Sequence, residues 1–146
     1  MIVHTLKQAK AALAAASVCD VYITIRTSPG ASHYMGLTFL KALFEEAKKT
    51  YPKVTHGVVV DCGFDAALAH RAMVMGFNQI SFSGTKTMKN KLSKIGVQLG
   101  SRLVSPRTPP NAVDLSNTQR PEHACMLYLQ RDLERTKKSD RLEIKD

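Results

Sequence analysis

Small polar side chains follow three predicted strands of this chain, and they are the residues best suited to bind a ligand. They lie in the segments 28–33, 61–65 and 83–87, each of which contains a glycine. A glycine lets backbone N–H groups approach a ligand, and the N-terminus of a following helix adds donors and partial positive charge. The three segments together could therefore bind a phosphate or a carboxylate. The candidate ligand-binding residues are Ser28, Gly30, Ser32, His33, Asp61, Cys62, Gly63, Ser83, Gly84 and Thr85.

The same residues also have a purely structural interpretation. Turns between a strand and a helix commonly contain Gly, Ser or Thr, because these residues turn the chain and cap the next helix. Thr85, for example, is placed to cap a helix that starts after it. The sequence leaves both interpretations open.

Three of these residues could also support catalysis. Asp61 could act as a general base or orient a substrate hydroxyl, and Cys62 could be a nucleophile if a helix N-terminus lowered its pKa. His33 could reach the same edge of the sheet as Asp61 and form an acid–base pair with it. However, an aspartate at a strand end commonly caps the next helix, and a cysteine beside a valine run is most often a small buried apolar residue. Whether the protein is an enzyme stays open.

The sequence has no complete motif for binding a nucleotide or a metal. Gly84-Thr85-Lys86-Thr87 resembles only the end of a phosphate-binding loop, because the first glycine that GxxxxGK[ST] requires is missing. A GxGxxG fingerprint is missing as well. The three cysteines and five histidines are scattered, with no CxxC or HxxxH pair. We therefore predict no metal site and no cofactor.

The chain carries a net charge of +9 at pH 7, and this charge is unevenly distributed. Residues 1–104 contain 13 basic and 5 acidic residues, whereas residues 105–146 contain 8 and 7. A positive field favours anionic partners, from phosphate esters to nucleic acids. Lys86, Lys89 and Lys94 would share the solvent side of one helix, but no helix-turn-helix or RNP-like motif accompanies them. Nucleic acid is therefore a less favoured partner than a small anion.

Hydrophobic patterns alternate between strands and helices over the first two thirds of the chain. The predicted strands span 20–26, 58–60, 79–83 and 102–104, and the predicted helices span 5–16, 35–50, 64–75 and 85–99. This alternation indicates βαβ crossovers and a parallel sheet. The unbroken valine run 58–60 is typical of a central strand that is buried on both faces. The predicted fold is a three-layer α/β/α sandwich with a mainly parallel sheet of about four strands, plus a C-terminal helix.

The chain divides into three parts by composition. Residues 1–104 form the α/β domain, and residues 105–120 form a connector whose prolines favour an extended conformation. Residues 121–146 form a C-terminal helix and a charged tail. We expect this helix to reach about Lys138 and its apolar stripe to cover another part of the protein. The tail from Ser139 onward is expected to be frayed.

Several short motifs resemble a family of small uncharacterised bacterial α/β proteins. They are Ser28-Pro29-Gly30-Ala31, Asp61-Cys62-Gly63, an Ala-rich helix that ends at Gly76, and Pro109-Pro110 with Asp114-Leu115. The resemblance spans residues 5–115 and implies a bacterial α/β protein of no assigned activity. Members of that family often have an acidic residue after Asp-Cys-Gly, whereas Phe64 stands here and Asp65 follows.

Partners and location can also be predicted. A small sheet exposes two edges that must be covered or paired, so we expect a homo-oligomer. No apolar run approaches the roughly 20 residues of a membrane helix, so we expect no membrane partner and a cytoplasmic location. The predicted function is the binding of a small anionic ligand. The alternatives are a non-catalytic oligomeric scaffold or interaction protein and a basic nucleic-acid-binding protein.

Overall fold

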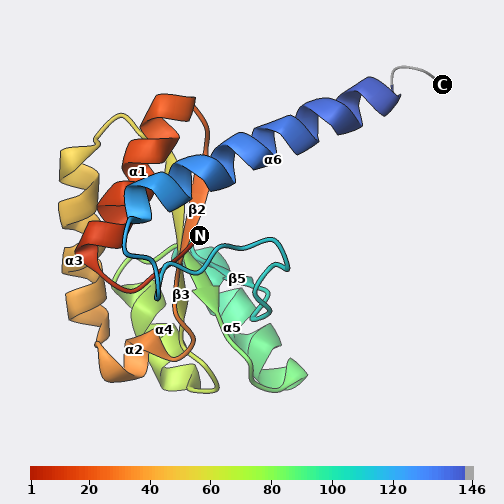
Figure 1. Cartoon of the computed structure of the whole chain (residues 1–146). Coiled ribbons are helices and arrows are strands. Elements are labelled where there is room, and N and C mark those ends of the chain that lie inside the picture. Colours follow the sequence, from red (N-terminus) through yellow and green to blue (C-terminus); the bar gives the residue numbers. More distant parts are fainter. Residues whose placement is uncertain (144–146) are drawn as a thin grey trace.

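The computed structural model describes the backbone of residues 1–143 and the side chains of residues 1–136 (Figure 1). It confirms the α/β class and contains a five-stranded parallel sheet in the order β1-β2-β3-β4-β5. The strands are β1 (Ile2–Val3), β2 (Ile23–Thr27), β3 (His56–Asp61), β4 (Gln79–Ser81) and β5 (Arg102–Val104). The strand with the valine run is central, as predicted. The sheet has one strand more than the expected four, because β1 contains only two residues and is too short to show a period.

The six described helices are α1 (Leu6–Cys19), α2 (Ala31–Tyr34), α3 (Leu37–Thr50), α4 (Ala66–Val74), α5 (Lys86–Gln98) and α6 (Pro121–Glu143). Three of them, α1, α4 and α5, begin after a residue whose side chain caps them. Thr5 accepts a hydrogen bond from the N–H of Gln8 at 3.2 Å, and Thr85 accepts one from Met88 at 3.3 Å. Both caps were predicted from the sequence. The short helix α2 was not predicted and overlaps the segment 28–33, which we expected to connect a strand to the next helix.

One face of the sheet packs against the crossover helices. Ile25 pairs with Val58, and Val60 pairs with Ile80, so these four side chains point to the same face. They pack in one core with side chains of α1, α3, α4 and α5. Parallel strands in sequential order with right-handed crossovers place every crossover helix on the same side. In Figure 1, α1 and α3 lie to the left of the strands, and α4 and α5 lie in the lower part of the view, with α5 at the right.

Arg26 lies on the face of the sheet that points away from the crossover helices, because its neighbour Ile25 points toward them. The guanidinium of Arg26, on β2, donates hydrogen bonds to the backbone oxygens of Ser105 and Arg107, just beyond β5. The connector that follows β5 therefore approaches β2 on this face.

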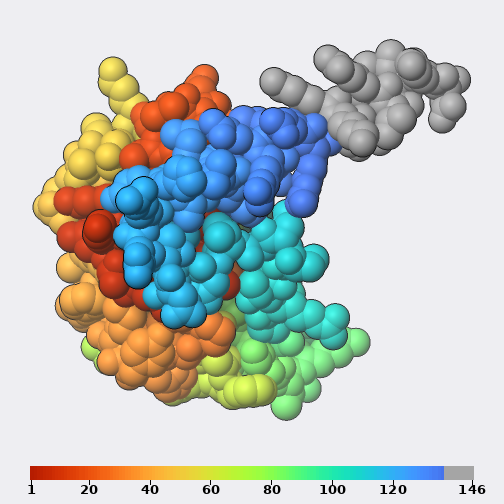
Figure 2. All heavy atoms as spheres, in the orientation of Figure 1, coloured from red at the N-terminus to blue at the C-terminus, as the bar shows by residue number. Residues whose placement is uncertain are grey.

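The connector and α6 cover the β1 edge of the sheet and the neighbouring helix α1. The connector pairs with the outer edge of β1, because Ile2 donates to Val113 O at 2.8 Å and Leu115 donates to Ile2 O at 3.1 Å. The α6 helix packs on α1 through the buried side chains of Cys125 and Leu129. Figures 1 and 2 show both segments in front of the sheet. The apolar stripe of the last helix thus covers α1, which fulfils the expectation that it would cover another part of the protein.

The C-terminal helix is longer than predicted. It continues to Glu143 instead of ending near Lys138, and its second half extends beyond the body of the protein (Figure 1). Of the charged tail that we expected to be frayed, residues 144–146 lie outside the described residues. None of the described helices combines the length and the hydropathy that a membrane crossing requires.

Candidate functional site

Two of the three predicted segments meet at the carboxyl edge of the sheet, where the carboxylate of Asp61 joins them. Its Oδ1 accepts hydrogen bonds from the N–H groups of Gly30 at 2.9 Å and Gly63 at 3.1 Å. Its Oδ2 accepts one from the hydroxyl of Ser81 at 2.8 Å. Asp61 is only 8% exposed. Its carboxylate therefore receives the two glycine donors that we had expected to bind an external anion.

Arg26 is the cationic counterpart of this cluster. It lies on the same face of the sheet as Asp61, because Arg26 pairs with Val59 and residues 59 and 61 of a strand point the same way. Burial lowers the pKa of the guanidinium, and the negative charge of Asp61 partly offsets this effect. The arginine is also bound to two connector oxygens. Its role is to hold the connector against the sheet, and sequence analysis did not identify it.

The polar side chains of the first segment are bound within the protein. Ser32 donates a hydrogen bond to the backbone oxygen of Asp61, and the hydroxyl of Ser28 is hydrogen-bonded to that of Tyr34. The imidazole of His33 lies 3.7 Å from a carboxylate oxygen of Asp65, and both side chains are about half exposed. His33 thus reaches the predicted edge, but the carboxylate that it contacts is that of Asp65.

Cys62 has the environment of a structural cysteine. Its side chain is fully buried and belongs to the core between the sheet and the helices. The pKa of the thiol is raised to about 11, chiefly by burial; a hydrogen bond with Ser32 acts against this rise, and the charges of Asp61 and Asp65 add to it. The thiol is therefore protonated at neutral pH. This protonation state supports the apolar interpretation of Cys62, because only the thiolate is a good nucleophile.

The third segment joins the second through the backbone. Ser83 donates its N–H to Gly63 O at 2.7 Å, and Thr85 caps α5. The ring of Phe82 lies against Gly84, where an added Cβ would come within 2.2 Å of that ring. Within the described residues, no buried side-chain nitrogen or oxygen lacks a hydrogen-bond partner. The carboxyl edge is consequently a hydrogen-bonded cluster whose polar groups are largely satisfied.

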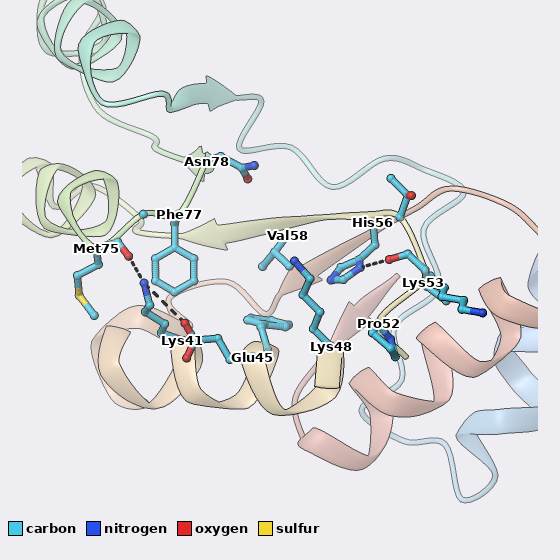
Figure 3. A pocket seen from close by; sticks show the side chains of 14 residues that line it. Lys41, Glu45, Lys48, Pro52, Lys53, His56, Val58, Met75, Phe77 and Asn78 are labelled. Carbon is cyan, nitrogen blue, oxygen red and sulfur yellow. Dashed lines mark hydrogen bonds and ion pairs between the residues drawn. The ribbon is translucent and has the colours of Figure 1, made fainter. Parts of the chain in front are cut away.

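A cavity of about 420 Å³ lies at the opposite, amino edge of the sheet (Figure 3). It is bounded by α3 and by the residues at the starts of β3 and β4. Phe44, Val58 and Phe77 supply its apolar wall. In Figure 3 the ring of Phe77 points from the start of β4 toward α3. The cavity therefore has an apolar surface large enough to contact part of a small molecule.

The cationic side chains of this cavity differ in how they are paired. Lys41 donates to the backbone oxygen of Met75, and its ammonium lies 3.8 Å from a carboxylate oxygen of Glu45. Lys48 extends toward Val58 (Figure 3), and among the described residues no carboxylate lies within ion-pair distance of it. The ammonium of Lys53 points away from the cavity in Figure 3. Lys48 is therefore the cation that remains free to bind an anion here.

His56 lies at the same end of the cavity as Lys48. Its Nδ1 is 3.0 Å from the backbone oxygen of Val54. A carbonyl oxygen can only accept, so Nδ1 carries a proton and donates it to Val54. The second ring nitrogen, Nε2, is left to interact with a ligand. It accepts a hydrogen bond when the ring is neutral and donates one when the ring is protonated.

Comparisons with known proteins assign no family to the chain. No protein-family model matches the sequence, and no curated protein matches it. The resemblance to a bacterial family therefore stays a prediction. No group of three or more His, Cys, Asp or Glu side chains that could hold a metal occurs in the described part of the chain.

Sequence analysis did not identify the amino-edge cavity, although part of its signal is visible in the sequence. Lys41, Glu45 and Lys48 are four and three residues apart, a spacing that places them on the same side of a helix. Nothing in that spacing shows that this side faces a hollow. The hollow exists because Val58 of β3 and Phe77, two residues before β4, lie opposite α3.

Proposed function

We propose that this protein binds a small anionic ligand in the amino-edge cavity. The observation that supports the proposal is the ammonium of Lys48, which pairs with no carboxylate of the described residues, beside the available Nε2 of His56 at a cavity with an apolar wall. The net charge of +9 adds a field that attracts anions. Pockets with an apolar lining and a few polar groups are the usual binding sites for small molecules.

The contrast with the carboxyl edge also supports this location. The N–H groups of Gly30 and Gly63 already donate to Asp61, and an external anion would have to displace that carboxylate or approach it closely. Two negative charges at such short range repel each other strongly in a partly buried site. The proposal therefore keeps the ligand class predicted from the sequence and changes its location.

The direct test is a pair of matched lysine variants. Lys48→Gln removes the free cation, whereas Lys49→Gln removes its neighbour, which is 75% exposed, pairs with Glu46 and does not line the cavity. Binding of pyrophosphate should be measured by isothermal titration calorimetry at low salt. A hydrogen bond to a charged group contributes about 1.5–3 kcal/mol, so Lys48→Gln should weaken binding about tenfold or more.

Lys49→Gln should leave the affinity for pyrophosphate nearly unchanged. Equal losses in the two variants would show that net charge alone attracts the anion, and the cavity would then be rejected as the site. Thermal unfolding of both variants provides a check that neither substitution acts through the fold.

A second candidate function is nucleic-acid binding through α5. This helix contains Lys86, Lys89, Lys91 and Lys94 and no acidic residue. Lys86 is exposed, and among the described residues none of the four has a carboxylate within ion-pair distance. A positive helix face of this kind fits a phosphate backbone without reading its sequence.

A further inference from the structure

We infer that the ligand of the amino-edge cavity is an aromatic acid, in which a phosphate or carboxylate group is attached to an aromatic ring system. This inference depends on the proposed function, because it concerns the same cavity. It adds that the ligand has two chemically different parts, which contact opposite ends of the site.

The size of the cavity argues against a bare inorganic anion. Its volume is about 420 Å³, whereas a tetrahedral anion occupies the space of about two or three water molecules of about 30 Å³ each. Such an anion bound at Lys48 would leave most of the apolar wall in contact with water. A ligand with a larger body would cover that wall and remove apolar surface from water.

The polar groups of the cavity are divided between its two ends. At one end, the charge of Lys41 is balanced by Glu45, and its ammonium is hydrogen-bonded to Met75 O. At the other end, Lys48 and His56 have no acidic partner among the described residues. Figure 3 shows Phe77 beside the first end and Val58 between the two. The negative charge of the ligand should therefore be concentrated at the end that contacts Lys48.

The apolar wall favours a flat ring over an alkyl body. Two of its members, Phe44 and Phe77, are aromatic, and both are at least nine-tenths buried, so their positions are fixed. Aromatic rings gain more from stacking or edge-to-face contact than from burial alone. The hydrocarbon stem of Lys48 can cover a ring while its ammonium contacts the anion.

The test compares probes that differ in one part at a time. The probes are inorganic phosphate, 1-naphthyl phosphate, decahydronaphthyl phosphate, 1-naphthoate and neutral 1-naphthol, titrated into the full chain by calorimetry. We expect 1-naphthyl phosphate to bind at least about 30-fold more tightly than inorganic phosphate, from the apolar area it buries. It should also bind several-fold more tightly than the saturated analogue. The comparison of 1-naphthoate with 1-naphthyl phosphate distinguishes a site that requires phosphate from a site that binds any anionic group.

Variants of the apolar wall complete the test. Phe77→Leu keeps an apolar side chain but removes the ring. It should therefore lower the affinity for 1-naphthyl phosphate several-fold and leave the affinity for inorganic phosphate almost unchanged. If Phe77→Leu does not fold, Val58→Thr replaces it. This variant should also lower the affinity for 1-naphthyl phosphate more than the affinity for inorganic phosphate. Lys48→Gln should lower the affinity for both 1-naphthyl phosphate and inorganic phosphate about tenfold.

Each outcome separates this inference from the proposed function. If 1-naphthyl phosphate binds no more tightly than inorganic phosphate, the inference that the ligand contains an aromatic ring is rejected, whereas the proposed binding of an anion is retained. If neutral 1-naphthol binds as tightly as its phosphate, the requirement for an anion is wrong. If no anionic probe binds, both the inference and the proposed function are rejected.

Discussion

Both edges of the sheet carry polar side chains, but the two edges use them in opposite ways. At the carboxyl edge, Asp61 is nearly buried and accepts hydrogen bonds from Gly30, Gly63 and Ser81. At the amino edge, Lys48 and His56 border an open cavity. Among the described residues, no group is bound to the ammonium of Lys48 or to Nε2 of His56. A polar residue at a strand end is thus a weak indication of a site unless its hydrogen-bonding capacity is free.

The difference has an energetic reason. Buried polar groups must find partners, because an unsatisfied donor or acceptor in the interior costs about 1–3 kcal/mol. Where three loops converge, the protein's own groups supply those partners, and the carboxylate of Asp61 takes the place of a bound anion. Where α3 faces the strand starts, long side chains reach solvent and do not need an internal partner. Binding capacity is therefore left at the amino edge.

The largest expected effect concerns the carboxyl edge. Asp61→Ala would leave three hydrogen-bond donors without their acceptor and Arg26 without a nearby negative charge, so we expect a loss of about 3–5 kcal/mol in the free energy of unfolding. Asp61→Asn keeps one acceptor oxygen and should cost about 1–2 kcal/mol. Urea denaturation measures both values.

Asp65→Asn is the matched control for this experiment. Asp65 caps α4, and asparagine caps a helix about as well as aspartate does, so the stability should change little. If Asp61→Ala proved as stable as the wild type, the cluster would not be structural, and Asp61 would again be a candidate ligand-binding residue.

A second prediction concerns the reactivity of Cys62. With its pKa raised to about 11, about one thiol in a thousand is a thiolate at pH 8. Alkylation by iodoacetamide should therefore be about 100-fold slower at Cys62 than at an ordinary thiol, and burial slows it further. Because the pKa is raised, the rate should increase as the pH rises toward 11.

The three cysteines of the chain allow an internal comparison in this experiment. Peptide mass spectrometry can follow them separately, and Cys19, which is only partly buried, should react first. Rapid modification of Cys62 at neutral pH would show that the thiol is accessible and activated. Such a result would restore the nucleophile interpretation of the carboxyl edge.

The smallest expected effect separates the cavity from α5. Replacing Lys86, Lys89 and Lys94 with Gln should change the affinity for 1-naphthyl phosphate less than about twofold at 0.15 M salt, because exposed charges are screened beyond about 8 Å. None of the three residues lines the cavity. A larger loss would show that α5 contributes to the binding of small anions.

The same triple variant tests nucleic-acid binding. If α5 binds a phosphate backbone, the substitutions should weaken duplex DNA binding at every sequence and reduce its dependence on salt. If the wild-type protein shows no detectable DNA binding at low salt, the second candidate function is rejected.

Local patterns predicted most of the elements. The caps at Thr5 and Thr85 and the stop at Gly76, which has φ of 88°, depend on contacts within one helical turn. The valine run correctly indicated the central strand β3. The strand β1 and the helix α2 were missed, since two and four residues contain too little periodicity to recognise.

Pairing across the fold could not be predicted in the same way. Asp61 was recognised as a candidate, but its partner Gly30 lies 31 residues away on another loop. The connector segment that pairs with Ile2 is more than one hundred residues distant in sequence. Such contacts depend on strand register and on how separate segments pack, which the composition of a single segment does not specify.

By itself, the sequence determined the parallel α/β architecture, the central strand and the excess of positive charge, because hydrophobic period, capping and charge are properties of short segments. Only the tertiary structure decided which polar groups are satisfied and which remain available. It brought the N–H groups of Gly30 and Gly63 to Asp61, and it placed Phe77 opposite α3 so that a cavity lies beneath Lys48. The reason is that a hydrogen bond or a cavity requires groups from separate segments to meet within a few ångströms, and only packing sets those distances.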